Sequence, residues 1–167
     1  MDIELHPYNS DWPAQFERER ILLNETIGRW VGGSIEHVGS TSVPGLVAKP
    51  IIDIMVGVDS LEASTGAIEE LSNVEYCYYP YLPDEMDWFC KPSPDYRTHH
   101  VHLVPYNSQR WCSALQFRDA LRANHELAAE YVALKCQLAA SHGHDREAYT
   151  QQKGPFIKKV LSTVTHV

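Results

Sequence analysis

The chain has 167 residues, of which 44% are hydrophobic and 22% charged, a size and balance that suit one folded domain over residues 1–167 and exclude a disordered chain. Its formal net charge of −8 excludes a general electrostatic attraction to DNA, RNA or anionic lipid, whereas a few local cations can still bind a small anion. The N-terminal sequence MDIELHPYNS has neither the basic start nor the apolar run of a signal peptide, and no stretch approaches the length of a membrane span. We therefore expect a cytoplasmic protein.

The first predicted element is a helix. Asn9 or Ser10 is a suitable N-cap, and apolar residues recur at helical spacing from Trp12 to Trp30. Gly32 and Gly33 predict the end of this helix, and a short strand is expected over Ile35 to Val38.

A turn and a sheet are predicted next. The turn GSTSVPGL is followed by PIIDIMVGV, whose apolar and β-branched residues are typical of a buried strand, and a second helix is expected over Leu61 to Leu71. Further strands are predicted over VEYCYYPYL, MDWFCKP and RTHHVHLVP. From about Ser108 the pattern is helical, with breaks at Asn124 or His125 and at SHGHD. We therefore predict an α/β (α+β) fold, in which helices cover a small mixed sheet of about five strands and the C-terminal third is helical.

The turn and the strand that follows it have the residues of a phosphate and metal site. Gly39 and Ser40 end a strand, and small residues and Gly45 let the backbone pass close to a ligand. Exposed N–H groups and the hydroxyls of Ser40, Thr41 and Ser42 are donors suited to phosphate oxygens. Asp53, on the next strand, offers a carboxylate to Mg²⁺ or Mn²⁺. The alternatives are an ordinary structural turn and a buried acid bonded to backbone.

This arrangement resembles the pattern of nucleotidyltransferases of the DNA polymerase beta superfamily, in which a hydrophobic-Gly-Ser turn precedes a strand with metal-binding acids. Along nearly the whole chain the sequence also resembles the GrpB family, through HVGSTSVPGL, KPIIDI, HHVHLVP, FRDALRAN and a late grouping of Tyr149, Lys153 and Phe156. The resemblance implies a nucleotidyltransferase-like fold with Asp53 as the catalytic carboxylate, and it places Tyr149 and Lys153 at the pocket. GrpB-like domains also occur joined to dephospho-CoA kinase, which implies an accessory role without catalysis as an alternative.

The sequence departs from the superfamily pattern at one position. Active nucleotidyltransferases present two acids two residues apart, so that both face the same side of the strand, but the residue two after Asp53 is Met55. One aspartate is a poor substitute for a two-metal clamp. The paired-carboxylate site is therefore incomplete.

Histidines on the last predicted strand are candidates to replace the missing acid. Alternation along RTHHVHLVP puts His100 and His102 on one face and His99 on the other. If this strand lies beside that of Asp53, the three side chains form an Asp/His/His site that favours Mn²⁺, Zn²⁺ or Fe²⁺ over Mg²⁺. Alternatively, the imidazoles bond backbone carbonyls or tyrosines, or donate to a phosphate.

Cations near these strands are candidate phosphate ligands. Lys49 precedes the Asp53 strand and Arg97 begins the histidine strand, although a lysine at a strand end is commonly solvated. Lys153 joins them through the family resemblance alone. Arg118 and Arg122 are four residues apart on a helix, a spacing for which ion pairs with Asp119 or Glu126 are the usual explanation.

Three functions fit these features. The first is a nucleotide- or phosphate-binding domain of nucleotidyltransferase type, with metal-dependent transfer to a small acceptor that the sequence does not identify. The second is a catalytically inactive nucleotide-binding module, which accounts more simply for Met55. The third is a His-x-His metalloenzyme. The expected partner is a small nucleotide or phosphate ligand rather than a nucleic acid polymer or a membrane.

Overall fold

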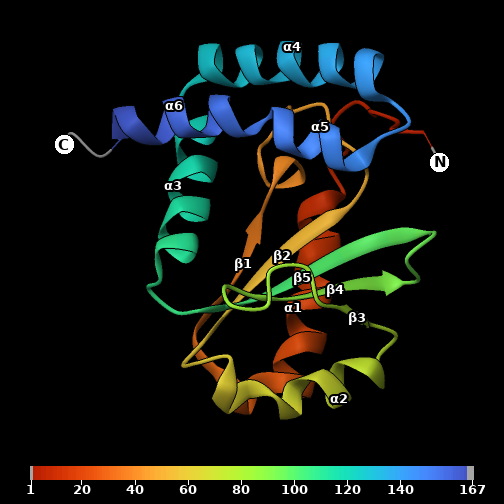
Figure 1. Ribbon diagram of the computed structural model, residues 1–167, viewed down its shortest axis with the longest axis vertical. Helices are drawn as coiled ribbons and strands as arrows, with labels where there is room; N and C mark the ends of the chain where they lie inside the picture. The colour runs from red at the N-terminus through yellow and green to blue at the C-terminus, as the bar shows by residue number, and fades with distance from the viewer. Residues whose placement is uncertain (1, 165–167) are drawn as a thin grey trace.

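A five-stranded mixed sheet lies at the centre of the protein, whose computed structural model describes residues 2–164 (Figure 1). The strand order is β1-β2-β5-β4-β3. The central pair, β2 and β5, is parallel, and the other pairs are antiparallel. The strands are β1 (Val31–Val38), β2 (Ile52–Val58), β3 (Cys77–Tyr79), β4 (Asp87–Pro92) and β5 (Arg97–Pro105). The expected small mixed sheet is confirmed.

Helices cover both faces of the sheet and one of its ends. They are α1 (Trp12–Ile27), α2 (Gly66–Ser72), α3 (Gln109–Ala123), α4 (His125–His142), α5 (Arg146–Gln152) and α6 (Gly154–Val164). In Figure 1, α4, α5 and α6 lie together above the end of the sheet at which β1 finishes and β2 begins. The helical C-terminal third is therefore confirmed, and it lies over the end of the sheet that carries Asp53. None of the helices within residues 2–164 combines the length and apolar character that crossing a membrane requires.

Alternation along β2 sends its side chains to two different environments. Ile52, Ile54 and Val56 are fully buried in the main core, which α1 and α2 complete. On the opposite face, Met55 belongs to a smaller apolar cluster beneath α3. Asp53 lies on that second face beyond the end of the cluster, so the sheet has an apolar half and a polar half on this side.

The prediction that Gly32 and Gly33 end the first helix is wrong. The helix ends at Ile27, a short 3-10 turn covers Gly28–Trp30, and both glycines lie inside β1. A Cβ at Gly33 would lie 2.1 Å from the Tyr106 ring, and one at Gly32 would lie 2.1 Å from the Asp59 carboxylate. These glycines permit close packing on a strand rather than stopping a helix.

Two helix boundaries also differ from expectation. The helix predicted over Leu61 to Leu71 is a 3-10 turn, Glu62–Ser64, followed by the shorter α2. The C-terminal segment contains a break that the sequence analysis did not place, between α5 and α6 at Lys153. Pro155 disfavours a continuous helix there, because it lacks an N–H and restricts the residue before it.

Candidate metal and phosphate site

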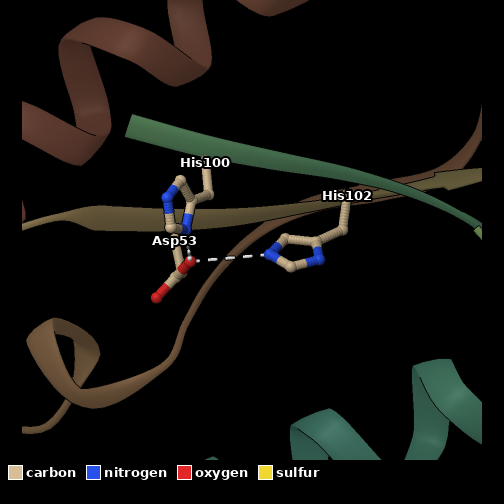
Figure 2. Close-up of side chains that lie close together, drawn as sticks. All are labelled: Asp53, His100 and His102. Carbon is tan, nitrogen blue, oxygen red and sulfur yellow. Dashed lines mark hydrogen bonds and ion pairs between the residues drawn. The ribbon is translucent and has the colours of Figure 1, made fainter. Parts of the chain in front are cut away.

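The parallel pairing of β2 with β5 brings Asp53, His100 and His102 together. Asp53 is the register partner of His100, and Met55 is the partner of His102. The Asp53 Oδ1 lies 3.0 Å from His100 Nδ1 and 3.5 Å from His102 Nε2. Figure 2 shows this oxygen between the two imidazoles. The spatial arrangement required for an Asp/His/His site is therefore present.

The spacing of these atoms suits a common metal ion. One ligand atom from each of the three residues can be chosen so that all lie within 4.8 Å of one another. Two ligand atoms that are each about 2.1 Å from an ion can be at most about 4.2 Å apart, so the observed separations of Asp53 Oδ1 from both histidine nitrogens fit with small adjustments. Two imidazoles and one carboxylate favour Mn²⁺, Fe²⁺ or Zn²⁺ over Mg²⁺.

Electrostatics keep the carboxylate ionised. Burial opposes the charged form of Asp53, but hydrogen bonds with His100 and His102 hold the pKa of this carboxyl well below its usual range. Burial lowers the pKa of His100 despite the neighbouring aspartate, which favours a neutral imidazole. Within residues 2–164, the buried Nε2 of His100 has no hydrogen-bond partner. An ionised carboxylate beside a neutral imidazole is the protonation state that a metal ion requires.

Gly39 places the predicted phosphate-binding turn against Asp53. Its φ of 73° lies in the left-handed region, and a Cβ at this position would lie 2.6 Å from Asp53 Oδ2. Only glycine combines this backbone conformation with so close an approach. The turn therefore forms one wall of the site.

The hydroxyls of the turn have different roles. Thr41 Oγ1 donates to the Ile51 carbonyl, and Ser42 Oγ donates to the Gly39 carbonyl. Both side chains are buried, so their hydroxyls shape the turn, whereas the Ser40 hydroxyl bonds Tyr131. The structure does not direct the Thr41 and Ser42 side chains to a ligand as the sequence analysis expected.

Two lysines lie over the Tyr149 ring, and a third, Lys135, lies over the ring of Tyr131. Lys49 Nζ lies 5.0 Å and Lys153 Nζ 4.7 Å from the centre of the Tyr149 ring. Lys135 donates to the Val47 carbonyl and is almost fully buried. The buried Tyr149 hydroxyl has no hydrogen-bond partner among the described residues. Lys49, Lys153 and Tyr149, the candidates of the sequence analysis and the resemblance, therefore lie together.

The charges of these lysines repel one another, and this repulsion lowers their pKa values. Burial and the charge of Lys49 lower the pKa of Lys153 to about 8, although Asp53 opposes this effect. Burial and the charges of Lys153 and Lys49 lower the pKa of Lys135 to about 7. Burial also lowers the pKa of Lys49; Asp53 opposes this effect, and the charges of Arg146 and Arg97 add to it. In a protein of net charge −8, this is a local basic site with one carboxylate at its centre.

Helix α3 contributes residues that the sequence analysis interpreted differently. Arg118 pairs with Asp119 as expected, and also with Glu36. Arg122 was expected to pair with Asp119 or Glu126, but its Nε donates to the Ser42 carbonyl over 2.9 Å. Arg122 therefore stabilises the 39–42 turn by a hydrogen bond from helix α3. The sequence analysis did not name Arg146 or Lys135 as candidate site residues.

Replacement of one lysine should stabilise the ligand-free protein. Lys153→Met is expected to raise the free energy of unfolding by about 2 kcal/mol at pH 7, because it removes a half-buried charge that its neighbours repel. The pKa of Lys153 is about 8 in the folded protein against an ordinary value of 10.5, so the wild type regains this stability as the pH rises through that interval. Urea unfolding at pH 7 and pH 10 measures both effects.

Lys159→Met, at an exposed position on α6, is the matched control and should change stability little at either pH. Equal effects of the two substitutions would contradict the repulsion that we infer at Lys153.

Comparison with known proteins supplies a family for this fold and site. A family model described as "GrpB protein" matches residues 2–163. The chain is 34% identical to the glutamate-rich protein GrpB of Alkalihalophilus pseudofirmus, over 96% of this chain and 95% of that protein. The crystal structure of conserved protein GrpB from Enterococcus faecalis superposes with a TM-score of 0.86 and 36% identity, over 96% of each chain.

A relative of different organisation also matches. A dephospho-CoA kinase of Mycolicibacterium paratuberculosis is 28% identical over 93% of this chain, but the match spans only 44% of that protein.

Proposed function

The chain belongs to the GrpB family, and from this premise we propose that it binds the phosphate groups of a nucleotide through one divalent metal ion at Asp53, His100 and His102. The ion is of the Mn²⁺, Fe²⁺ or Zn²⁺ class, and it neutralises phosphate oxygens in the manner of a nucleotidyltransferase-type domain. Transfer of the nucleotidyl group to a small acceptor is the reaction that such a site would serve.

The observation that carries the proposal is the placement of a three-residue metal cluster beside a group of mutually repelling cations. A site that binds only a metal ion does not require neighbouring lysines, and a site that binds only an anion does not require the Asp/His/His cluster. Lys49 and Lys153 flank Tyr149 and both interact with the charge of Asp53, so one ligand can contact the ion and the lysines together. A metal-bound phosphate chain has this combination of charges.

The binding role is better supported than catalysis. Met55 is 2% exposed in an apolar cluster with Val104 and Trp111, so the strand offers one carboxylate rather than two. The match to part of a dephospho-CoA kinase agrees with a nucleotide-binding module that accompanies another activity. A His-x-His metalloenzyme is the remaining candidate, and it has no need of the lysines.

Thermal unfolding with and without ligands tests this proposal. Nucleoside triphosphates with Mn²⁺ at 100 times the dissociation constant should stabilise the fold by about 2.7 kcal/mol, or several degrees in melting temperature, if they bind only the native state. Mn²⁺ alone should give a smaller shift, and the metal-free triphosphate a smaller one still. Stabilisation by metal with no further effect of any triphosphate would favour the metalloenzyme. Unchanged melting temperatures with every ligand would exclude nucleotide binding.

A further inference from the structure

An aromatic surface continues the candidate site along the sheet. Trp88 on β4 is the register partner of His102, and Tyr79 on β3 is the partner of Trp88. Partners in adjacent strands point to the same face, so both aromatic side chains lie on the face that carries Asp53. We call Trp88 and Tyr79 the aromatic platform.

The platform is in contact with the metal cluster. The Trp88 ring centre lies 4.9 Å from that of His100, whose Nδ1 lies 3.0 Å from Asp53 Oδ1. One imidazole thus separates the indole from the carboxylate. A ligand with its phosphates at the ion can therefore extend along the sheet towards Trp88.

The platform is held in place on one side and open on the other. Trp88 packs against the apolar cluster that contains Met86, and it remains partly exposed. Tyr79 is 57% exposed on an edge strand and meets Trp88 edge-on, with ring centres 6.1 Å apart. The Arg97 guanidinium lies 5.2 Å from the Trp88 ring centre. Rigid aromatic rings with an arginine beside them are the groups on which nucleobases stack.

We propose that the aromatic platform, with Arg97, stacks the base of the nucleotide, an inference that rests on the proposed function of the neighbouring site. Stacking uses the π-face that every base has, so it does not depend on the hydrogen-bonding edges by which the bases differ. The platform therefore selects nucleotides over phosphate chains without a base, and it discriminates weakly among the four bases.

Calorimetry with two ligands tests this inference. With Mn²⁺ present, ATP should bind the wild type at least about fivefold more tightly than inorganic tripolyphosphate, and the other three nucleoside triphosphates should resemble ATP. Trp88→Leu and the milder surface variant Tyr79→Ser should weaken ATP binding by about fivefold or more and leave tripolyphosphate unchanged. Trp88→Phe, which keeps an aromatic face, should retain most of the affinity for ATP.

Trp30→Leu is the matched control. Trp30 also has an arginine over its ring, Arg29 at 4.0 Å, but it packs against the main core on the opposite face of the sheet. This variant should bind both ligands as the wild type does. Equal affinity of the wild type for ATP and tripolyphosphate, or equal losses of affinity for both in Tyr79→Ser, would contradict base stacking on the platform. The proposed phosphate site would not be affected by this result. No binding of either ligand would overturn both proposals.

Discussion

Asp53→Asn is expected to lower the affinity for Mn²⁺ by at least about 100-fold, because changes even in groups that only orient metal ligands cost tenfold to 100-fold. The amide keeps an oxygen that accepts a hydrogen bond from His100 Nδ1, so the side chain can stay in place without its charge. A loss of Mn²⁺ affinity would therefore result from the missing metal ligand rather than from a structural change at the site. Calorimetric titration of metal-free protein with Mn²⁺ at pH 7 measures it.

The same substitution should destabilise the metal-free protein by about 2 kcal/mol, since Lys49, Lys135 and Lys153 lose the negative charge that offsets their mutual repulsion. Asp87→Asn is a suitable control: Asp87 is another buried acid of this sheet, but it bonds Tyr78 and is not part of the metal cluster. It should leave Mn²⁺ binding unchanged. Equal Mn²⁺ affinity of Asp53→Asn and the wild type would remove the metal site from the proposed function.

The parts of the site that the sequence predicted come from local periodicity. The two-residue spacing of His100 and His102 fixes their common face once the segment is a strand, and β5 has the predicted bounds, Arg97–Pro105. The spacing does not predict which strand lies beside β5. The parallel pairing of β2 with β5 depends on how α2, β3 and β4 fold between them. The contact of Asp53 with the histidines therefore depends on tertiary structure, which the spacing does not predict.

The parts that the sequence analysis missed depend on packing between distant segments. Lys135 lies in an apolar helix, and its burial follows from the position of α4 over the 39–49 segment, where it donates to Val47. Arg122 has acids within helical reach, yet the turn at Ser42 offers a carbonyl that needs a donor. Intrahelical spacing predicts the local partner, whereas the buried carbonyl determines the observed one.

Met55→Asp is expected to destabilise the metal-free protein by about 3 kcal/mol or more, because it buries a charge in the cluster of Val104 and Trp111 and removes a packed side chain. Met55 is the register partner of His102, on the same face as Asp53, so the new carboxylate would adjoin the metal cluster. Two neighbouring acids repel, and the pKa of one of them should rise when no metal is present.

A divalent ion should reverse this effect. Mn²⁺ neutralises both carboxylates, so Met55→Asp should bind it at least about tenfold more tightly than the wild type, and the melting temperature should rise more on Mn²⁺ addition. Met55→Asn provides the matched control, because it has the same shape and similar packing loss without the charge, and it should gain no affinity. If Met55→Asp binds Mn²⁺ no better than Met55→Asn, the apolar cluster beneath α3 keeps position 55 apart from the ion. The absence of a second acid would then give no support to the proposal of binding rather than nucleotidyl transfer.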